Sequence, residues 1–170
     1  MPSPHRKWFE RSGKTGEAIV RTRAHIYNKS AKHHQTIIPT TTAHGALILG
    51  AIPTITQLGK ISVENGGRPI TRISLLASDE EGAMGYGDDP IHIELFDHSV
   101  LDPSTGKNIS IDKMQEHIQA IFEQTQNPES VLYCHCMAGH SRSFTTVLSL
   151  LYSHPELLTD SNLKPKGTYP

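Results

Sequence analysis

The chain has 170 residues, of which 36% are hydrophobic and 19% are charged, and its formal net charge at pH 7 is -1. These values fit one compact domain that can bury a hydrophobic core. Because neither sign of charge dominates, the composition gives no argument for a nucleic acid or a membrane as an obligatory partner, and we expect no nucleic-acid binding.

The first 42 residues differ in composition from the rest of the chain. They are polar and broken by Gly and Pro, and only residues 18–26 fit a short helix. Residues 6–32 carry eight Lys or Arg and two acidic residues. We therefore divide the chain into a basic N-terminal extension, residues 1–42, and a folded domain, residues 43–170. The extension is either a solvated arm or a contact surface for an anionic lipid or another anionic partner.

Short apolar runs bounded by Gly and Pro predict the strands of the folded domain. These runs are residues 46–49, 70–77, 91–95 and 131–136. Apolar residues at helical spacing predict helices over residues 111–122 and 144–151. Strands that alternate with helices indicate an α/β fold, in which helices flank a central sheet and binding sites lie at the carboxyl ends of the strands.

The segment most informative about function is residues 131–143, VLYCHCMAGHSRS. It predicts a strand, a loop of small residues and the start of an amphipathic helix. In that arrangement the loop amides and the helix N-terminus form an anion site the size of a phosphate. The loop residues that would surround the anion are Met137, Ala138, Gly139, His140, Ser141 and Arg142.

Two side chains of this segment fit nucleophilic chemistry on a phosphate. Helix N-termini and nearby cations favour the thiolate form of a cysteine, so Cys136 is predicted to be the attacking group. Arg142, six positions later, has the planar guanidinium that can hold two phosphoryl oxygens. Ser143 could donate a hydrogen bond to the sulfur, and His135 could fix the loop from behind.

The spacing HCxxGxxRS, from His135 to Ser143, resembles the signature loop of the cysteine-based protein tyrosine phosphatase superfamily, and AGxSRS resembles its dual-specificity type. The resemblance extends over roughly residues 44–153. It implies a dual-specificity-phosphatase-like fold with the signature loop between a central strand and a helix. It also implies hydrolysis of phosphomonoesters through a phosphocysteine, most naturally on phosphotyrosine, phosphoserine or phosphothreonine proteins, without a metal or cofactor.

The same family uses an aspartate before the cysteine as general acid. Asp97, in the sequence LFDHS, has the local sequence that resembles the family. Asp102, which opens the loop DPSTG, lies closer to the usual spacing and is the alternative acid.

Two other functions fit parts of the sequence. The basic extension and residues 49–53, LGAIP, resemble phospholipid or phosphoinositide phosphatases. A phospho-binding module with weak or no turnover is the other alternative. Eleven scattered histidines without ligand spacing give no metal site.

The two cysteines lie only two positions apart and cannot join distant segments. Cys134 is expected to be a buried strand thiol, with a role as oxidation partner of Cys136 as the alternative. No apolar stretch is long enough to span a membrane or to serve as a secretory signal. We therefore expect a cytoplasmic protein.

Overall fold

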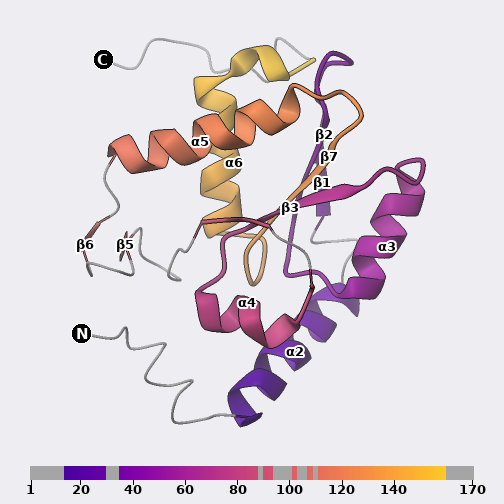
Figure 1. Ribbon diagram of the computed structural model, residues 1–170, viewed down its shortest axis with the longest axis vertical. Helices are drawn as coiled ribbons and strands as arrows, with labels where there is room; N and C mark the ends of the chain where they lie inside the picture. The colour runs from indigo at the N-terminus through magenta and orange to yellow at the C-terminus, as the bar shows by residue number, and fades with distance from the viewer. Residues whose placement is uncertain are drawn as a thin grey trace.

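A mixed five-stranded sheet with helices on both faces forms the centre of the structure, a computed structural model (Figure 1). The structure describes residues 14–29, 35–87, 90–93, 101–102, 107–108 and 111–159. In chain order, the elements are α2 (Lys14–Lys29), β1 (Gln35–Ile38), β2 (Ala46–Gly50), α3 (Ile55–Glu64), β3 (Ile70–Ser74), α4 (Ser78–Met84), β4 (Ile91–His92), β5 (Leu101–Asp102), β6 (Lys107–Asn108), α5 (Ile111–Thr125), β7 (Val131–His135), α6 (Arg142–Ser153) and the 3-10 helix η2 (Pro155–Leu157).

The strand order in the sheet is β1-β2-β7-β3-β4. Strand β1 is antiparallel to β2, whereas β2, β7, β3 and β4 run parallel. In the register, His135 at the end of β7 lies between Gly50 of β2 and Ser74 of β3. The carboxyl ends of the three central strands therefore meet at one edge of the sheet, where α/β folds place their binding sites. The expected α/β fold with a flanked central sheet is confirmed.

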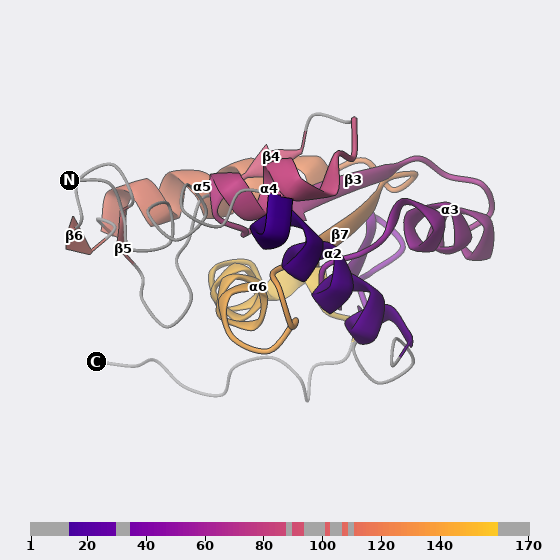
Figure 2. The same ribbon diagram turned by 90° about the horizontal axis from the view of Figure 1, so that it is seen from below.

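The two faces of the sheet are covered by different helices, because alternate residues of a strand point to opposite sides. Helices α5 and α6 pack on one face and α3 on the other (Figure 2). The cluster under α5 and α6 includes Leu47, Leu49, Ile73, Leu132, Cys134, Ile118, Ile121, Val147 and Leu150. The cluster under α3 consists of Ile48, Ile61, Val131 and Tyr133. Strand β7 is buried along its whole length, as a central parallel strand should be.

Part of the segment that the sequence sets apart as an extension packs into this core. Strand β1 pairs with β2 over its four residues. Helix α2, which is longer than the expected 18–26, buries Val20 and Ala24 against Ile52, Leu76, Ala83 and Met137. The change in composition at residue 42 therefore does not mark a change in packing. Among the described side chains of α2, Val20 and Ala24 are buried, whereas Arg21, Thr22 and Arg23 are exposed.

Several predicted elements are confirmed and others differ. Strands β2 and β7 match the predicted runs within one residue, and α5 and α6 contain the predicted helices. The predicted strand 70–77 ends at Ser74, and its last residues lead into α4, a helix that the sequence analysis did not predict. Helix α3 was also not predicted. It begins at Thr54, whose Oγ1 accepts a hydrogen bond from Gln57 N, as an N-cap does.

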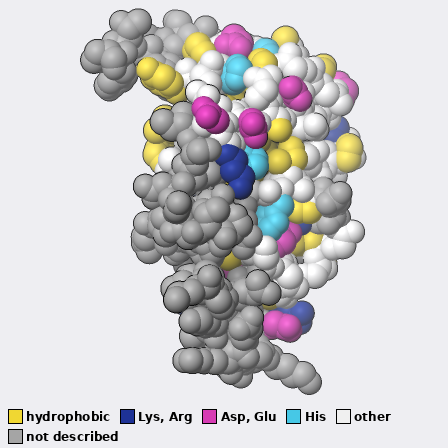
Figure 3. All heavy atoms as spheres, turned by 60° about the vertical axis from the view of Figure 1, so that its left-hand side comes forward, with side chains coloured by type: hydrophobic (Ala, Val, Ile, Leu, Met, Phe, Trp, Pro, Cys, Tyr) yellow, Lys and Arg dark blue, Asp and Glu magenta, His cyan; other side chains and the backbone are white. Residues whose placement is uncertain are grey.

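Charged side chains do not gather on the face shown in Figure 3. Acidic, basic and histidine side chains lie there among hydrophobic ones, and no cluster of one sign stands out among the described residues.

Within the same described residues, no helix is both long and apolar enough to cross a membrane. One cation of the basic segment has a structural partner, since Arg21 Nε donates to the carbonyl of Ala83 in α4.

Candidate active site

Residues 136–141, here called the Cys136 loop, connect the end of β7 to the start of α6. Cys136 is buried, with 2% of its surface exposed, and its Sγ lies 3.3 Å from Ser143 Oγ. The hydroxyl and the sulfur are therefore within hydrogen-bonding distance, the contact that the sequence predicts. His140 and Ser141 are exposed at the far side of the loop.

Gly139 fixes the conformation of the loop. Its φ is 75°, in the left-handed region that favours glycine. A Cβ at this position would lie 2.7 to 2.8 Å from backbone atoms of Gly50 and Ala51. Ile52, two residues after the end of β2, donates a backbone hydrogen bond to Met137 O of the loop at 3.1 Å. The Cys136 loop is thus pressed directly onto the end of β2.

Arg142 is held by the segment that follows β3. Its Nη1 donates to the carbonyl of Leu75 and to Glu80 Oε2, each at 3.0 Å. Glu80 lies in the first turn of α4. The same carboxylate oxygen accepts a hydrogen bond from the N–H of Ala77, the N-cap residue of that helix, at 3.0 Å. Arg142 and Glu80 are both buried. This ion pair fixes the plane of the guanidinium beside the loop.

Glu80 was missed by the sequence analysis, although a signal for it exists. Two glutamates, Glu80 and Glu81, follow a predicted parallel strand within a few residues. Because the carboxyl ends of parallel strands meet at one edge, acidic residues there face the basic residue that follows the neighbouring strand. Because no helix was predicted there, no partner was assigned to Arg142.

A second buried arginine lies behind the loop. Arg72 Nη2 donates to Glu81 Oε1 at 2.6 Å, and Ser74 Oγ donates to the other oxygen of that carboxylate at 2.6 Å. The guanidinium carbon lies 3.7 Å from the centre of the Tyr86 ring. Arg72 Nη1 lies 3.1 Å from His135 Nε2. A guanidinium can only donate, so Nε2 accepts and His135 carries its proton on Nδ1.

His135 is held neutral by this environment. It is completely buried, and burial, followed by the charge of Arg72, holds the pKa of the imidazole well below its ordinary value of 6.5. The residue therefore sits directly behind Cys136 as a neutral, hydrogen-bonded ring. The expectation that His135 supports the loop from behind stays a prediction, since the contacts of the ring are with Arg72, Tyr86 and Tyr133.

Cys134 is a buried thiol on the face of β7 that packs under α6, as the sequence predicts. Its Sγ lies 4.0 Å from the carbonyl oxygen of Ser143. Burial, and to a smaller extent the neighbouring Cys136, raises the pKa of Cys134 far above its ordinary value. The two cysteines thus share a neighbour in Ser143, and Cys134 stays protonated.

Of the two aspartates proposed as general acid, the described residues include only Asp102. Asp97 lies outside them. Asp102 is the last residue of β5, whose backbone pairs with Lys107 of β6 in a separate two-stranded sheet.

The start of α6 has no side-chain cap. Ser141 is the N-cap residue, and its side chain makes no capping hydrogen bond. The first N–H groups of an α-helix have no partner within the helix. Here they follow the Cys136 loop directly, at the edge of the sheet where β7 ends at His135.

Among the described residues, no group of three or more His, Cys, Asp or Glu side chains is placed to hold a metal ion. No protein-family model, curated protein or solved structure matches the chain.

We expect Gly139→Ala to destabilise the protein by about 2–5 kcal/mol, because it combines a left-handed non-glycine residue with overpacking against the end of β2. Gly87→Ala is the matched control, since Gly87 has the same φ of 75° but open space around its Cβ position. It should cost only about 1–2 kcal/mol. Urea unfolding measures both, and equal losses would contradict the close approach.

We expect the stability of the protein to fall as the pH drops below 6.5, the ordinary pKa of histidine. In that range the unfolded chain binds a proton at residue 135 that the folded state does not, so the free energy of unfolding decreases with decreasing pH. The limiting slope is about 1.4 kcal/mol per pH unit for one proton. His135→Gln should show a shallower slope between pH 5 and 6.5, measured by urea unfolding at each pH.

His117→Gln is the control for this slope. The pKa of His117 is also lowered, first by burial and then by Lys113, but the residue is only partly buried. Its replacement should change the slope less than His135→Gln does. The same slope in wild type and His135→Gln would show that residue 135 is not a buried neutral base.

Proposed function

We propose that this chain hydrolyses phosphomonoesters through a phosphocysteine formed on Cys136, as the resemblance to dual-specificity phosphatases implies. One observation carries the proposal. A cysteine at the carboxyl end of a central strand has a serine hydroxyl 3.3 Å from its sulfur and is followed, one loop later, by an arginine whose guanidinium is fixed by Glu80. A buried structural thiol needs neither neighbour.

The Cys136 loop is proposed to bind the phosphoryl group. Successive amides of a glycine-containing loop, together with a helix N-terminus, attract an anion through their aligned N–H dipoles. The left-handed Gly139 and the absence of a side-chain cap on α6 support this role. A phosphate in the loop would take the place that a capping side chain occupies in an ordinary helix.

Arg142 is proposed to hold two phosphoryl oxygens and to stabilise the charge that spreads over them in the transition state. Bidentate binding requires a guanidinium plane of fixed orientation. The hydrogen bonds to Glu80 and to the Leu75 carbonyl support this requirement, since they engage Nη1 from the side of α4. Glu80 is therefore a positioning residue for Arg142.

The proposed reaction has two steps. In the first, the Cys136 sulfur attacks phosphorus, an S–P bond forms, and the ester P–O bond breaks as the leaving oxygen receives a proton from the general acid. In the second, water attacks phosphorus and the S–P bond breaks, which releases inorganic phosphate. Ser143, beside the sulfur, stabilises the departing thiolate in that step. Asp97 is the proposed acid and Asp102 the alternative.

The proposed substrates are proteins that carry phosphotyrosine, phosphoserine or phosphothreonine. The loop residues between Cys136 and Arg142 include no Lys or Arg that would favour a more highly charged inositide head group. The alternatives, a lipid phosphatase and a phospho-binding module, are separated from this proposal by turnover on phosphopeptides.

We expect wild-type protein to hydrolyse p-nitrophenyl phosphate without added metal and to be inhibited by vanadate. Cys136→Ser should lower kcat by on the order of a thousandfold or more, because a hydroxyl is a poor nucleophile at neutral pH. Cys134→Ser is the matched control two residues earlier, in β7, and should retain activity. Equal losses in both variants, or full activity in Cys136→Ser, would refute the proposed nucleophile.

Asp97→Asn and Asp102→Asn are expected to separate the two candidate acids. Loss of a general acid lowers the rate by roughly 10²–10⁴-fold, and the loss is largest for a poor leaving group. Phenyl phosphate, with its more basic leaving oxygen, should therefore be affected more than p-nitrophenyl phosphate in the Asp97 variant. Steady-state kcat values for both esters decide the assignment. Small, equal effects in both variants would show that neither Asp97 nor Asp102 is the general acid.

A further inference from the structure

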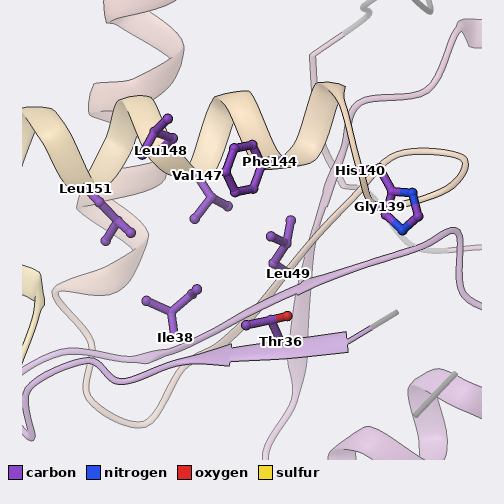
Figure 4. Close-up of a pocket in the computed structure, with 9 residues that line it drawn as sticks. All are labelled: Thr36, Ile38, Leu49, Gly139, His140, Phe144, Val147, Leu148 and Leu151. Carbon is purple, nitrogen blue, oxygen red and sulfur yellow. The ribbon is translucent and has the colours of Figure 1, made fainter. Parts of the chain in front are cut away.

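An apolar groove lies beside the Cys136 loop, between α6 and the strands β1 and β2 (Figure 4). Its volume is about 480 Å³, within the roughly 300–1,000 Å³ typical of ligand sites. The residues that line it are Thr36, Ile38, Leu49, Gly139, His140, Phe144, Val147, Leu148 and Leu151. In Figure 4 the side chains of α6 point across the groove toward those of the two strands.

The groove is continuous with the candidate active site. Gly139 and His140 belong both to the Cys136 loop and to the groove wall. Gly139 lies against the backbone of Gly50, and Gly50 is paired with Gln35 at the start of β1. A ligand held in the loop would therefore find the groove at its side, with β1 leading away from the loop.

The groove walls suit an apolar occupant. Six of its nine residues are hydrophobic, and the polar side chains are only Thr36 and His140. Phe144 and Leu148 remain 51% and 54% exposed, although they lie on the helix side of the groove. Because exposed apolar surface is covered favourably by another apolar group, these two residues mark where a ligand would gain most.

The backbone of strand β1 favours a peptide over a lipid as the occupant of the groove. It is an edge strand, and among the described strands only β2 pairs with it. The outer edge of such a strand can form backbone hydrogen bonds with an extended peptide, whose alternate side chains then enter neighbouring pockets. An acyl chain could fill the groove but could not use the strand. The lining also includes no Lys or Arg that would attract an anionic membrane surface.

We propose that this groove binds a large apolar side chain of a phosphopeptide substrate, whose backbone lies along β1 while its phosphate occupies the Cys136 loop. The inference rests on the proposed phosphatase function and adds a sequence preference to it. From Phe144 to Leu151 the groove extends about 10 Å along α6, at about 1.5 Å per residue. This length corresponds to about three residues of an extended chain, so the apolar side chain lies within about three residues of the phosphoresidue.

The test uses pairs of phosphotyrosine peptides, one pair for each position near the phosphotyrosine. The two peptides of a pair differ only at that position, which is leucine in one and serine in the other. For each enzyme, kcat/KM on the peptide is divided by kcat/KM on p-nitrophenyl phosphate, which has no group to fill the groove. We expect the wild type to prefer leucine at one or more of these positions by roughly tenfold. Leu148→Glu should remove this preference, because it places a charge in the groove.

Val63→Glu is the matched control. Val63 is 76% exposed and lies on α3, on the opposite face of the sheet from α6. This variant should keep both the leucine preference and the activity on p-nitrophenyl phosphate. No preference for leucine at any position, or a preference that Leu148→Glu leaves unchanged, would overturn the proposal.

Other occupants give different results. A rate advantage of decyl phosphate over ethyl phosphate that Leu148→Glu abolishes, with no peptide preference, would show a lipid-tail site and overturn the proposal. A dimer in light scattering that Leu148→Glu dissociates, again without peptide preference, would show an interface between two copies and overturn it as well.

Failure of the phosphatase proposal can be recognised separately. If wild-type protein hydrolyses none of the esters, binding of the leucine and serine peptides to Cys136→Ser is measured by fluorescence anisotropy. A leucine preference that depends on Leu148 would then support the groove and refute the catalytic proposal. Hydrolysis of all peptides at equal rates would support catalysis and refute the groove.

Discussion

The close approach of two backbone segments at Gly139 and Gly50 is the constraint on which the rest of the candidate site depends. A side chain at either position has no space. At Gly139 it would meet the backbone of β2, and at Gly50 it would meet the Tyr133 ring, whose hydroxyl donates to the Ala51 carbonyl at 2.9 Å. Because both residues lack a side chain, the Cys136 loop can lie against the end of β2, and α6 begins directly after the loop.

Helix α4 secures this arrangement from the other side. Its consecutive glutamates face two different arginines: Glu80 contacts Arg142 beside the loop, and Glu81 contacts Arg72 behind it. Burying an ion pair costs desolvation energy, which good geometry and additional hydrogen bonds offset. Here the additional bonds come from the Ala77 amide to Glu80 and the Ser74 hydroxyl to Glu81. Such pairs contribute specificity of position more than stability, and the short helix thereby fixes the guanidinium and the imidazole that adjoin the loop.

The sequence predicted the parts of this structure that follow from a local pattern. The buried run of β7, the small-residue loop and the stripe of α6 are adjacent in sequence, so local patterns of residue type identified them. Helix α3 was missed because its inward stripe is short, with Ile61 buried and Leu58 only partly buried. Helix α4 was missed because its first residues look like a polar turn, and Glu80 gains its partner only when β3 and β7 lie side by side. The groove was not predictable, since its walls come from β1 and β2 on one side and from α6 on the other, and about a hundred residues separate the two strands from α6 in the chain.

Part of the segment before residue 43 packs into the fold, although its composition predicts a solvated arm. A basic, polar stretch is expected to stay solvated, and most positions of α2 do. Two residues suffice to anchor it, however, because Val20 and Ala24 pack in the same cluster as Met137 of the Cys136 loop. Strand β1 then supplies Thr36 and Ile38 to the groove on the other side of that loop. The early part of the chain therefore contacts the candidate site at two places, and the exposed Arg21 and Arg23 belong to a helix that the core holds in position.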